Sequence, residues 1–155
     1  MNKKLSKYLG LIIASAMIPA SIPASTSAQS TNSYYNIVAA HSNKCAQVNG
    51  ASLSNGAVIS QWDCVNQNNV QWSFVYAGNG YFYIKARHSN KCAQVNGASL
   101  SNGAVISQWD CVNQDNVKWS LVSVGNGYYF IKAKHSGKCD QVNGASLSNG
   151  AVISQ

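Results

Sequence analysis

The chain of 155 residues contains no glutamate, and its acidic side chains are four aspartates, Asp63, Asp110, Asp115 and Asp140. A retaining or inverting glycosidase needs two facing carboxylates at a set separation, and local sequence places no pair of these aspartates in that way. The chain also lacks a G-x-S-x-G nucleophile elbow of the kind that exposes a catalytic serine. The sequence therefore predicts a protein that is not an enzyme and has no cofactor.

Long apolar runs are missing as well. The stretch Leu9 to Ile18 has about ten residues, too few to span a bilayer, and no later stretch is continuously apolar. Three lysines precede this stretch and small residues follow it, which is the layout of a secretory signal. We expect residues 1–28 to be a signal peptide, residues 29–33 a short linker, and the protein to be secreted without a membrane span. A membrane anchor is the alternative interpretation.

Clustered charge is also absent. Outside residues 1–28 the chain has eight basic and four acidic residues, a mild net charge of +4 that is spread along the sequence. Nucleic-acid-binding domains usually gather their basic residues on one face, so we expect no nucleic-acid partner. The remaining residues, about 127, suffice for one small domain with its own core.

The sequence does contain a repeat with a period of 47 residues. The segment KCAQVNGASLSNGAVISQWDC at 44–64 returns letter for letter at 91–111, and KCDQVNGASLSNGAVISQ fills 138–155. The units run over 34–80, 81–127 and 128–155, so the third unit holds 28 of its 47 residues. Repeated units of this length bury their apolar faces against one another, so we expect them to pack into one body.

Each unit has the pattern of four short strands joined by polar turns. Tyr81 to Ala86 is aromatic and β-branched, which favours a strand, and its alternation places Phe82, Ile84 and Ala86 on one face, the core face. The equivalent core positions in the other units are Tyr35, Ile37, Ala39, Tyr129, Ile131 and Ala133. Short strands follow at KCAQV, AVISQWDC and VKWSLVSV, with Asn-, Gly- and Ser-rich turns between them. The sequence predicts an all-β fold.

The arrangement of the units has three candidate architectures. Three four-stranded units assembled with pseudo-threefold symmetry make a β-trefoil. A propeller, which needs more blades, and an open β-solenoid are the alternatives, since propeller repeats are of similar length. The period alone does not choose among them.

The cysteines follow the same period. Cys45 and Cys64, like Cys92 and Cys111, lie 19 positions apart, and an exported chain with regular cysteines favours a disulfide within each pair. Each such loop should stabilise the fold by about 3 kcal/mol. Cys139 has no counterpart 19 positions later, because the sequence stops at residue 155. We expect it to be an unpaired thiol.

The histidines are also periodic. His41, His88 and His135 each precede a cysteine by four positions. A structural zinc site needs a second His/Cys pair at suitable spacing, and none accompanies them. We therefore predict no metal site.

The order of these features resembles one known family. An aromatic strand, S-x-K-C, an NG-rich loop, Q-W-D-C and N-x-x-W recur in register over 34–155. This is similar to the ricin-type β-trefoil lectin domain, a carbohydrate-binding module of secreted proteins. The family's closing Gln-x-Trp motif reads Val70-Gln71-Trp72 and Val117-Lys118-Trp119 here, with valine in place of the first glutamine. Both tryptophans are expected in the core.

The resemblance implies a shallow sugar site in each complete unit. A polar residue after the first cysteine and an asparagine before the closing tryptophan hold sugar hydroxyls, and an aromatic residue before the second cysteine stacks on the sugar. In this sequence these residues are Gln47, Trp62 and Asn69, then Gln94, Trp109 and Asn116, and in the third unit Gln141 alone. Glutamine stands where the family commonly has aspartate, and a neutral amide is the weaker acceptor.

The trio also makes physical sense without the family. An exposed tryptophan covers the apolar face of a sugar, and side-chain amides supply both donors and acceptors to its hydroxyls. The structural alternatives are core packing for Trp62 and Trp109 and a solvated strand position for Gln47 and Gln94. Asp63 and its counterpart in the second unit either help to bind or cap a turn.

The sequence thus favours a secreted, non-catalytic module that binds a glycan or polysaccharide through repeated weak sites, whose linkage raises avidity. One alternative is the targeting part of a larger secreted glycoside hydrolase or toxin, suggested by the end of the sequence at Gln155 inside a repeat. Another is a trefoil that acts as an inhibitor or in adhesion. The incomplete third unit also predicts open strand edges. We expect either marginal stability or a dimer through Cys139 or these edges.

Overall fold

The computed structural model describes residues 9–10 and 33–155, which form short strands with single turns of 3-10 helix between them. The expected signal peptide and linker lie outside this part of the chain, apart from residues 9, 10 and 33. The strands are β1 (Leu9–Gly10), β2 (Val38–Ala39), β3 (Cys45–Val48), β4 (Ile59–Trp62), β5 (Trp72–Gly78), β6 (Tyr81–Ala86), β7 (Cys92–Val95), β8 (Ile106–Trp109), β9 (Trp119–Gly125), β10 (Tyr128–Ala133), β11 (Gln141–Val142) and β12 (Ile153–Ser154). The 3-10 turns are η1 (Asn49–Ala51), η2 (Asn68–Val70), η3 (Asn96–Ala98), η4 (Asp115–Val117) and η5 (Asn143–Ala145).

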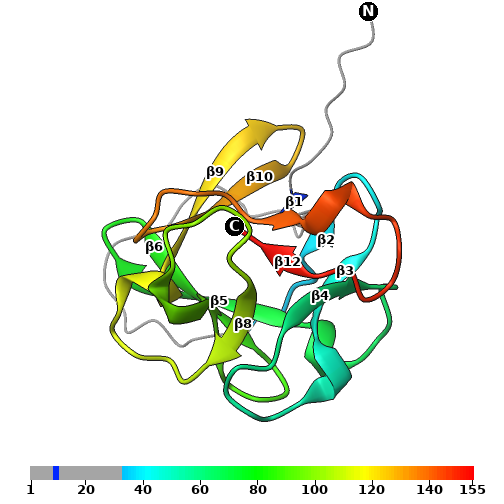
Figure 1. Cartoon of the computed structure of the whole chain (residues 1–155), viewed down its shortest axis with the longest axis horizontal. Coiled ribbons are helices and arrows are strands. Elements are labelled where there is room, and N and C mark those ends of the chain that lie inside the picture. Colours follow the sequence, from blue (N-terminus) through cyan, green and yellow to red (C-terminus); the bar gives the residue numbers. More distant parts are fainter. Residues whose placement is uncertain (1–8, 11–32) are drawn as a thin grey trace, which may run out of the picture.

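The sheets link each unit to the next. Within a unit the second and third strands form a hairpin, as β3 with β4 and β7 with β8 do. The last strand of one unit then pairs with the first strand of the following unit, β5 with β6 and β9 with β10. The edge of β2 is paired with β1, Leu9 opposite Ala39. Figure 1 shows the three units arranged around a centre where β12 lies, which is the β-trefoil architecture.

The hairpins that join units turn on an Asn-Gly pair. Asn79 and Gly80, between β5 and β6, both have positive φ, 52° and 80°. Two positive φ values in succession give the tight turn whose twist matches the paired strands. An Asn-Gly pair at 126–127 repeats this between β9 and β10. The short, polar sequence between two apolar strands therefore fixes their pairing.

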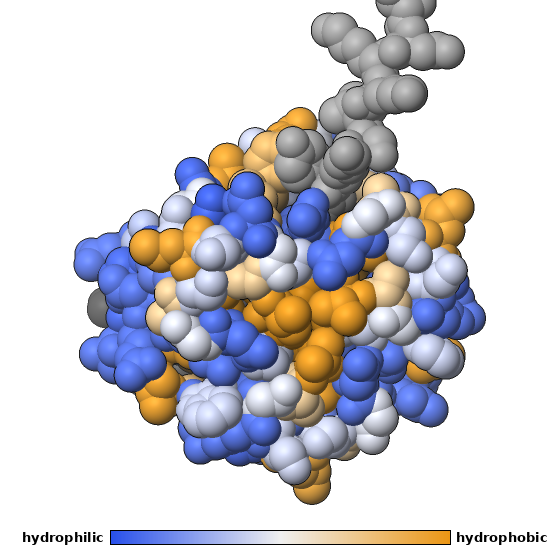
Figure 2. Space-filling view, viewed as in Figure 1, coloured by the Kyte–Doolittle hydropathy of each residue, from blue (hydrophilic) through white to orange (hydrophobic). Residues whose placement is uncertain are grey.

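Six isoleucines, two from each unit, form the largest group of residues in the core. These are Ile37, Ile84 and Ile131 from the first strand or its approach, and Ile59, Ile106 and Ile153 from the third strand. The predicted core faces are confirmed at the isoleucines and alanines, whereas Tyr35, Phe82 and Tyr129 are half-buried. Figure 2 shows apolar surface at the centre of one face, within a mostly polar rim.

The closing tryptophans lie in this core. Trp72 and Trp119 are buried, with 1 % and 0 % of their surface exposed. The indole Nε1 of Trp72 donates to the backbone oxygen of Ala46, and that of Trp119 to the backbone oxygen of Ala93, both at 2.9 Å. A buried indole needs such an acceptor. One prediction about this segment was wrong in detail, because Val117 belongs to η4 and the strand begins only at Trp119. The preceding 3-10 turn aims Val117 into the interior, where it is fully buried.

Both predicted disulfides are present. Cys45 bonds to Cys64 and Cys92 to Cys111, with Cα–Cα distances of 5.0 and 5.1 Å. Cys139 is free, as predicted, and half-buried. Burial raises the pKa of its thiol. Because the thiolate is the reactive form, the raised pKa lowers the reactive fraction of this thiol at neutral pH.

A fully buried glutamine closes the junction between units one and two. Gln108, on β8, donates from Nε2 to the backbone oxygens of Ser52 (2.7 Å) and Ser54 (2.8 Å), both in the NG-rich loop of unit one. Its Oε1 accepts from Ser89 Oγ at 2.7 Å, and His88 Nε2 donates to the Ser52 oxygen at 2.9 Å. We call this arrangement of a glutamine, a serine and a histidine around the loop of another unit the glutamine clamp.

The clamp occurs at all three junctions. Gln61 holds the backbone oxygens of Ser146 and Ser148 in unit three, and Gln155 holds those of Ser99 and Ser101 in unit two. His41 and His135 donate to the same loops. The periodic histidines are therefore junction residues. Across residues 9–10 and 33–155, no group of three His, Cys, Asp or Glu side chains is placed to hold a metal ion.

One carboxyl group lies inside the core. Asp140 takes the place that Ala46 and Ala93 hold in the other units, and it is 6 % exposed. It lines, with the core isoleucines, a cavity of about 20 Å³. No hydrogen-bond partner for its Oδ1 is found among the described residues. Desolvation raises the pKa of Asp140 well above the ordinary value of an aspartate.

The glutamine clamp predicts that truncation of Gln108 strongly lowers the free energy of unfolding. Gln108→Ala removes the three hydrogen bonds that the buried amide makes with Ser52, Ser54 and Ser89, and each hydrogen bond contributes about 0.5–1.5 kcal/mol. We expect the free energy of unfolding to fall by about 2–4 kcal/mol, measured by urea denaturation. The matched control is Gln114→Ala, at an exposed position, which should stay within about 0.5 kcal/mol of wild type. Equal losses in both variants would contradict the role of the clamp.

Asp140 predicts a pH-dependent penalty on stability. A raised folded-state pKa means that the folded chain binds more protons than the unfolded chain. The contribution of protonated Asp140 to the free energy of unfolding is therefore fully present below the unfolded pKa, and it is lost as the pH rises through the folded pKa. Asp140→Ala, which restores the residue of the other units, should raise the free energy of unfolding by about 1–3 kcal/mol at neutral pH. The difference from wild type should shrink toward pH 4.

The control for this prediction is Asp140→Asn, which keeps the shape and removes the titration. Its pH profile should run parallel to that of Asp140→Ala, because the remaining aspartates are unchanged in both. Unfolding curves at several pH values from 4 to 8 check this. A wild-type profile parallel to both variants would show that Asp140 does not titrate in the core.

Candidate functional site

Two of the four tryptophans are exposed. Trp62 ends β4 and Trp109 ends β8, and each is 41 % exposed. Trp62 lies opposite Cys45 in the β3–β4 register, and Gln47 lies opposite Ser60. Directly opposed residues share a face of the sheet, as do residues two apart on a strand, so Trp62 and Gln47 lie on the same face of this hairpin, opposite the core residues Ala46 and Val48. The core-packing alternative for these tryptophans does not hold.

Gln47 and Asn69 are brought together beneath this face. Asn69 Nδ2 donates to Gln47 Oε1 and to the backbone oxygen of Val48, both at 3.2 Å. Gln47 Nε2 donates to Ser60 Oγ at 3.4 Å, and that hydroxyl donates to Asn49 Oδ1. Gln47 is 9 % and Asn69 5 % exposed. Gln47 is thus a buried member of a polar network rather than a solvated strand residue.

The second unit repeats this arrangement. Asn116 Nδ2 donates to Gln94 Oε1 and to the backbone oxygen of Val95, both at 3.1 Å, and Gln94 Nε2 donates to Ser107 Oγ. In the third unit Gln141 is half-buried on the short strand β11. The structure therefore joins Gln47 to Asn69 and Gln94 to Asn116, and each glutamine shares a hairpin with Trp62 or Trp109.

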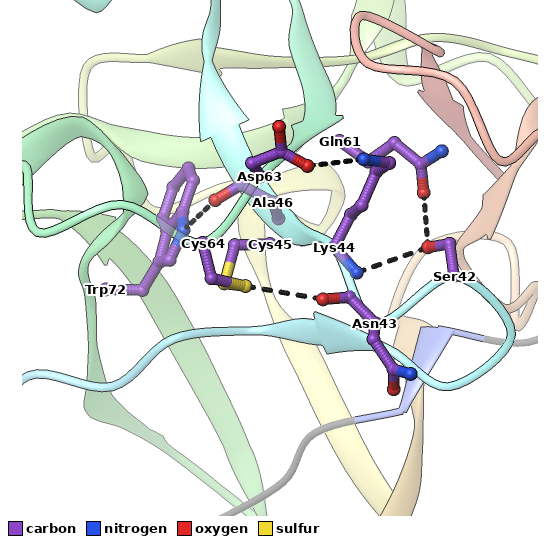
Figure 3. Close-up of a disulfide and its surroundings, with 9 residues drawn as sticks. All are labelled: Ser42, Asn43, Lys44, Cys45, Ala46, Gln61, Asp63, Cys64 and Trp72. Carbon is purple, nitrogen blue, oxygen red and sulfur yellow. Dashed lines mark hydrogen bonds and ion pairs between the residues drawn. A yellow bond between two sulfur atoms is a disulfide. The ribbon is translucent and has the colours of Figure 1, made fainter.

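A charged pair borders each exposed tryptophan. Lys44 Nζ lies 2.5 Å from Asp63 Oδ1, beside the Cys45–Cys64 disulfide, as Figure 3 shows. The hydrogen bond from Lys44, with a second from Asn149, holds the pKa of Asp63 below its ordinary value. In unit two Lys91 and Asp110 form the same pair at 2.5 Å, and the pKa of Asp110 is lowered for the same reasons. Both carboxylates are therefore ionised at neutral pH and below.

The asparagines that reach these carboxylates come from another unit, and sequence reasoning missed them. Asn149 Nδ2 donates to Asp63 Oδ2 and Asn55 Nδ2 donates to Asp110 Oδ2, each at 2.8 Å. Both asparagines lie in NG-rich loops, where asparagine is explained by turn formation alone. The one signal in the sequence is that the NG-rich loop and the QWDC segment are both repeated without change. If one junction between repeats brings these two segments together, the equivalent junction does so as well.

The part of the chain that the structure describes contains no helix long and apolar enough to cross a membrane. The features of the candidate sites are instead a half-exposed indole face, a buried amide network and an exposed charged pair. Such a surface offers an apolar platform bordered by donors and acceptors. It suits a ligand with an apolar face and a polar rim.

Comparison with solved structures shows the same fold in a designed protein, in part of an enzyme and in part of a lectin. The designed threefold symmetric protein ThreeFoil is 44 % identical, with a TM-score of 0.76, over 77 % of this chain and 86 % of that one. The exo-β-1,3-galactanase 1,3Gal43A from Clostridium thermocellum is 25 % identical, with a TM-score of 0.74, over 98 % of this chain and 27 % of that one. A Polyporus squamosus lectin is 20 % identical, with a TM-score of 0.66, over 80 % of this chain and 44 % of that one.

Sequence comparison agrees with the fold. No curated protein matches the chain. The family model described as ricin-type beta-trefoil lectin domain-like matches residues 25–109 and 68–155, which together cover all the repeats. This match agrees with the repeats and with the trefoil fold, and the chain belongs to the ricin-type β-trefoil lectin-like family.

Proposed function

We propose that this protein is a non-catalytic module that binds carbohydrate at two equivalent sites, one on Trp62 and one on Trp109. The observation that carries the proposal is the exposure of these two indoles, while the other tryptophans of the repeats are buried. A pyranose ring stacks its CH face on such an indole. The buried amides of Gln47 and Asn69, and those of Gln94 and Asn116, form the polar floor of the sites. Gln141 is the matching position in the third unit.

Two identical sites on one small body favour a repetitive ligand. Stacking buries on the order of 60 Å² of apolar surface, worth about 1.5 kcal/mol at about 25 cal/mol per Å², so one site alone binds weakly. Linking weak sites raises avidity by about 10²–10⁴ when the spacing of the target fits. A polysaccharide or a dense glycan surface supplies such repetition.

The disulfides support an extracellular location. Cys45–Cys64 and Cys92–Cys111 are the kind of bridge that forms and persists in oxidising compartments. We propose that the protein is secreted, which agrees with the signal-like pattern of residues 1–28. Glycans of cell surfaces and extracellular polysaccharides are then within reach.

A second candidate function is that of a targeting module attached to a catalytic part. The galactanase comparison favours it, because 98 % of this chain matches 27 % of an enzyme that degrades a polysaccharide. Both candidates place carbohydrate on the same tryptophans. The sequence of the encoding DNA on either side distinguishes them, since an adjoining in-frame glycosidase domain supports the targeting role and its absence supports a module that acts alone.

Substitution of the tryptophans tests the proposal. Trp62→Ala and Trp109→Ala should each abolish one site, and the double variant should bind a glycan array at least tenfold more weakly than wild type, because the stacking energy of about 1.5 kcal/mol corresponds to about a factor of ten. Val124→Ala, at an apolar position 47 % exposed on β9, is the control and should bind like wild type. Wild type without any glycan bound, or a double variant that binds equally well, would overturn the proposal.

A further inference from the structure

The polar floor of each site has little bonding capacity left for a ligand. Both N–H groups of Asn69 are already used, one by Gln47 and one by the backbone of Val48. The amide of Gln47 donates to Ser60 and accepts from Asn69. The same is true of Asn116 and Gln94. The groups that remain open to a sugar hydroxyl therefore have to come from elsewhere around the indole.

The loop of another unit supplies such groups. Trp62 Cζ3 lies 4.0 Å from the position a Cβ on Gly150 would take, so the ring borders the Asn149–Gly150 turn of unit three. Asn149 donates to Asp63 Oδ2, and Lys44 donates to Asp63 Oδ1. The Asp63 side chain is 62 % exposed, and Asn149 is exposed. An indole from one unit and an Asp–Asn pair spanning two units thus meet at one exposed place.

The other complete junction repeats this geometry independently. Trp109 Cζ3 lies 4.0 Å from the Cβ position of Gly56, Asn55 donates to Asp110 Oδ2, and Lys91 donates to Asp110 Oδ1. The Asp110 side chain is 60 % exposed. The third loop differs, because Asn102 accepts from Lys138 Nζ at 2.7 Å. That junction has no tryptophan or aspartate in the described chain.

We propose that each sugar site is a composite of two units, in which Asp63 and Asn149 beside Trp62, and Asp110 and Asn55 beside Trp109, bind the hydroxyl groups that select the sugar. The inference rests on the proposed carbohydrate-binding function and assigns its hydroxyl-binding groups. A carboxylate has about four lone-pair positions, of which two are used here, and asparagine Oδ1 is a further acceptor. Neighbouring hydroxyls of a neutral pyranose can donate to both.

The charge balance at the site favours a neutral sugar. Lys44 offsets the charge of Asp63, and Lys91 that of Asp110, so each site is close to neutral while its acceptor stays ionised. Hydrogen bonds to an ionised acceptor are the stronger class. The family commonly has an aspartate at the position of Gln47. Here a carboxylate next to the tryptophan supplies the same kind of acceptor from a different position.

The test compares asparagines that occupy equivalent loops. The Asn55→Ala/Asn149→Ala double variant removes the loop partner at both composite sites, and Asn102→Ala removes the same side chain where no tryptophan or aspartate meets it. The full-length proteins are screened on an array of neutral mono- and oligosaccharides, and the strongest wild-type ligand on the array is then titrated by calorimetry. Thermal unfolding of each variant separates loss of binding from loss of fold.

We expect the Asn55→Ala/Asn149→Ala variant to bind about tenfold more weakly and to change its order of preference among the sugars, with Asn102→Ala unchanged in both. A change in preference is a readout that a merely structural role would not move. If this double variant binds like wild type while Trp62→Ala/Trp109→Ala does not bind, the composite site is wrong and the proposed function stands. If wild type binds no sugar, both are overturned.

Discussion

The fold depends on buried glutamines that each satisfy backbone oxygens in a different unit. Gln61, Gln108 and Gln155 are buried, and a buried backbone carbonyl without a donor is costly. The NG-rich loops make local hydrogen bonds, such as that from Ala57 N to the Ser54 oxygen at 3.4 Å, and the clamp of another unit adds shorter ones to the same oxygens. The trefoil is therefore stabilised at its junctions by polar contacts, in addition to its isoleucine core. This explains why the loop and the clamp sequence repeat together.

The same junctions shape the surface. The clamps of Gln61 and Gln108 each bring the turn at the end of an NG-rich loop to the exposed tryptophan of a different unit, Trp62 and Trp109. Strand register alone would leave these indoles beside their own hairpin. The surface around each indole thus results from how the units are joined, and a change that loosens a junction also alters the surroundings of an indole.

Most of the fold could be predicted from the periodicity of the sequence. The alternation in Tyr81–Ala86 predicted the core face, and the spacing of 19 residues predicted both disulfides. Contacts between distant segments were not predictable, because nothing local links Gln61 to a loop 85 residues away. Asp140 differs from Ala46 at the only substituted position of the copied segment 138–155, yet its burial follows from the register of the core rather than from its polarity. The burial of Gln47 was not predicted, because its partner Asn69 comes from η2, 22 residues further along the chain.

The segment VNGASLSNGAVISQ is identical at 48–61, 95–108 and 142–155, so each glutamine clamp meets three chemically indistinguishable loops. Side-chain recognition cannot tell the correct loop from the other two, or from the same loops of a second molecule. The closure entropy of the chain does not explain the choice, since Gln61 holds the loop 85 residues away although an identical loop lies nearer in the sequence. The packing of the three units around one core selects the partner instead. At high protein concentration an identical loop of a second molecule competes for the same clamp, which is the kind of misassembly to which repeat proteins are prone. The sequence identity of the three repeats thus favours correct pairing of clamps and loops when the protein folds in dilute solution.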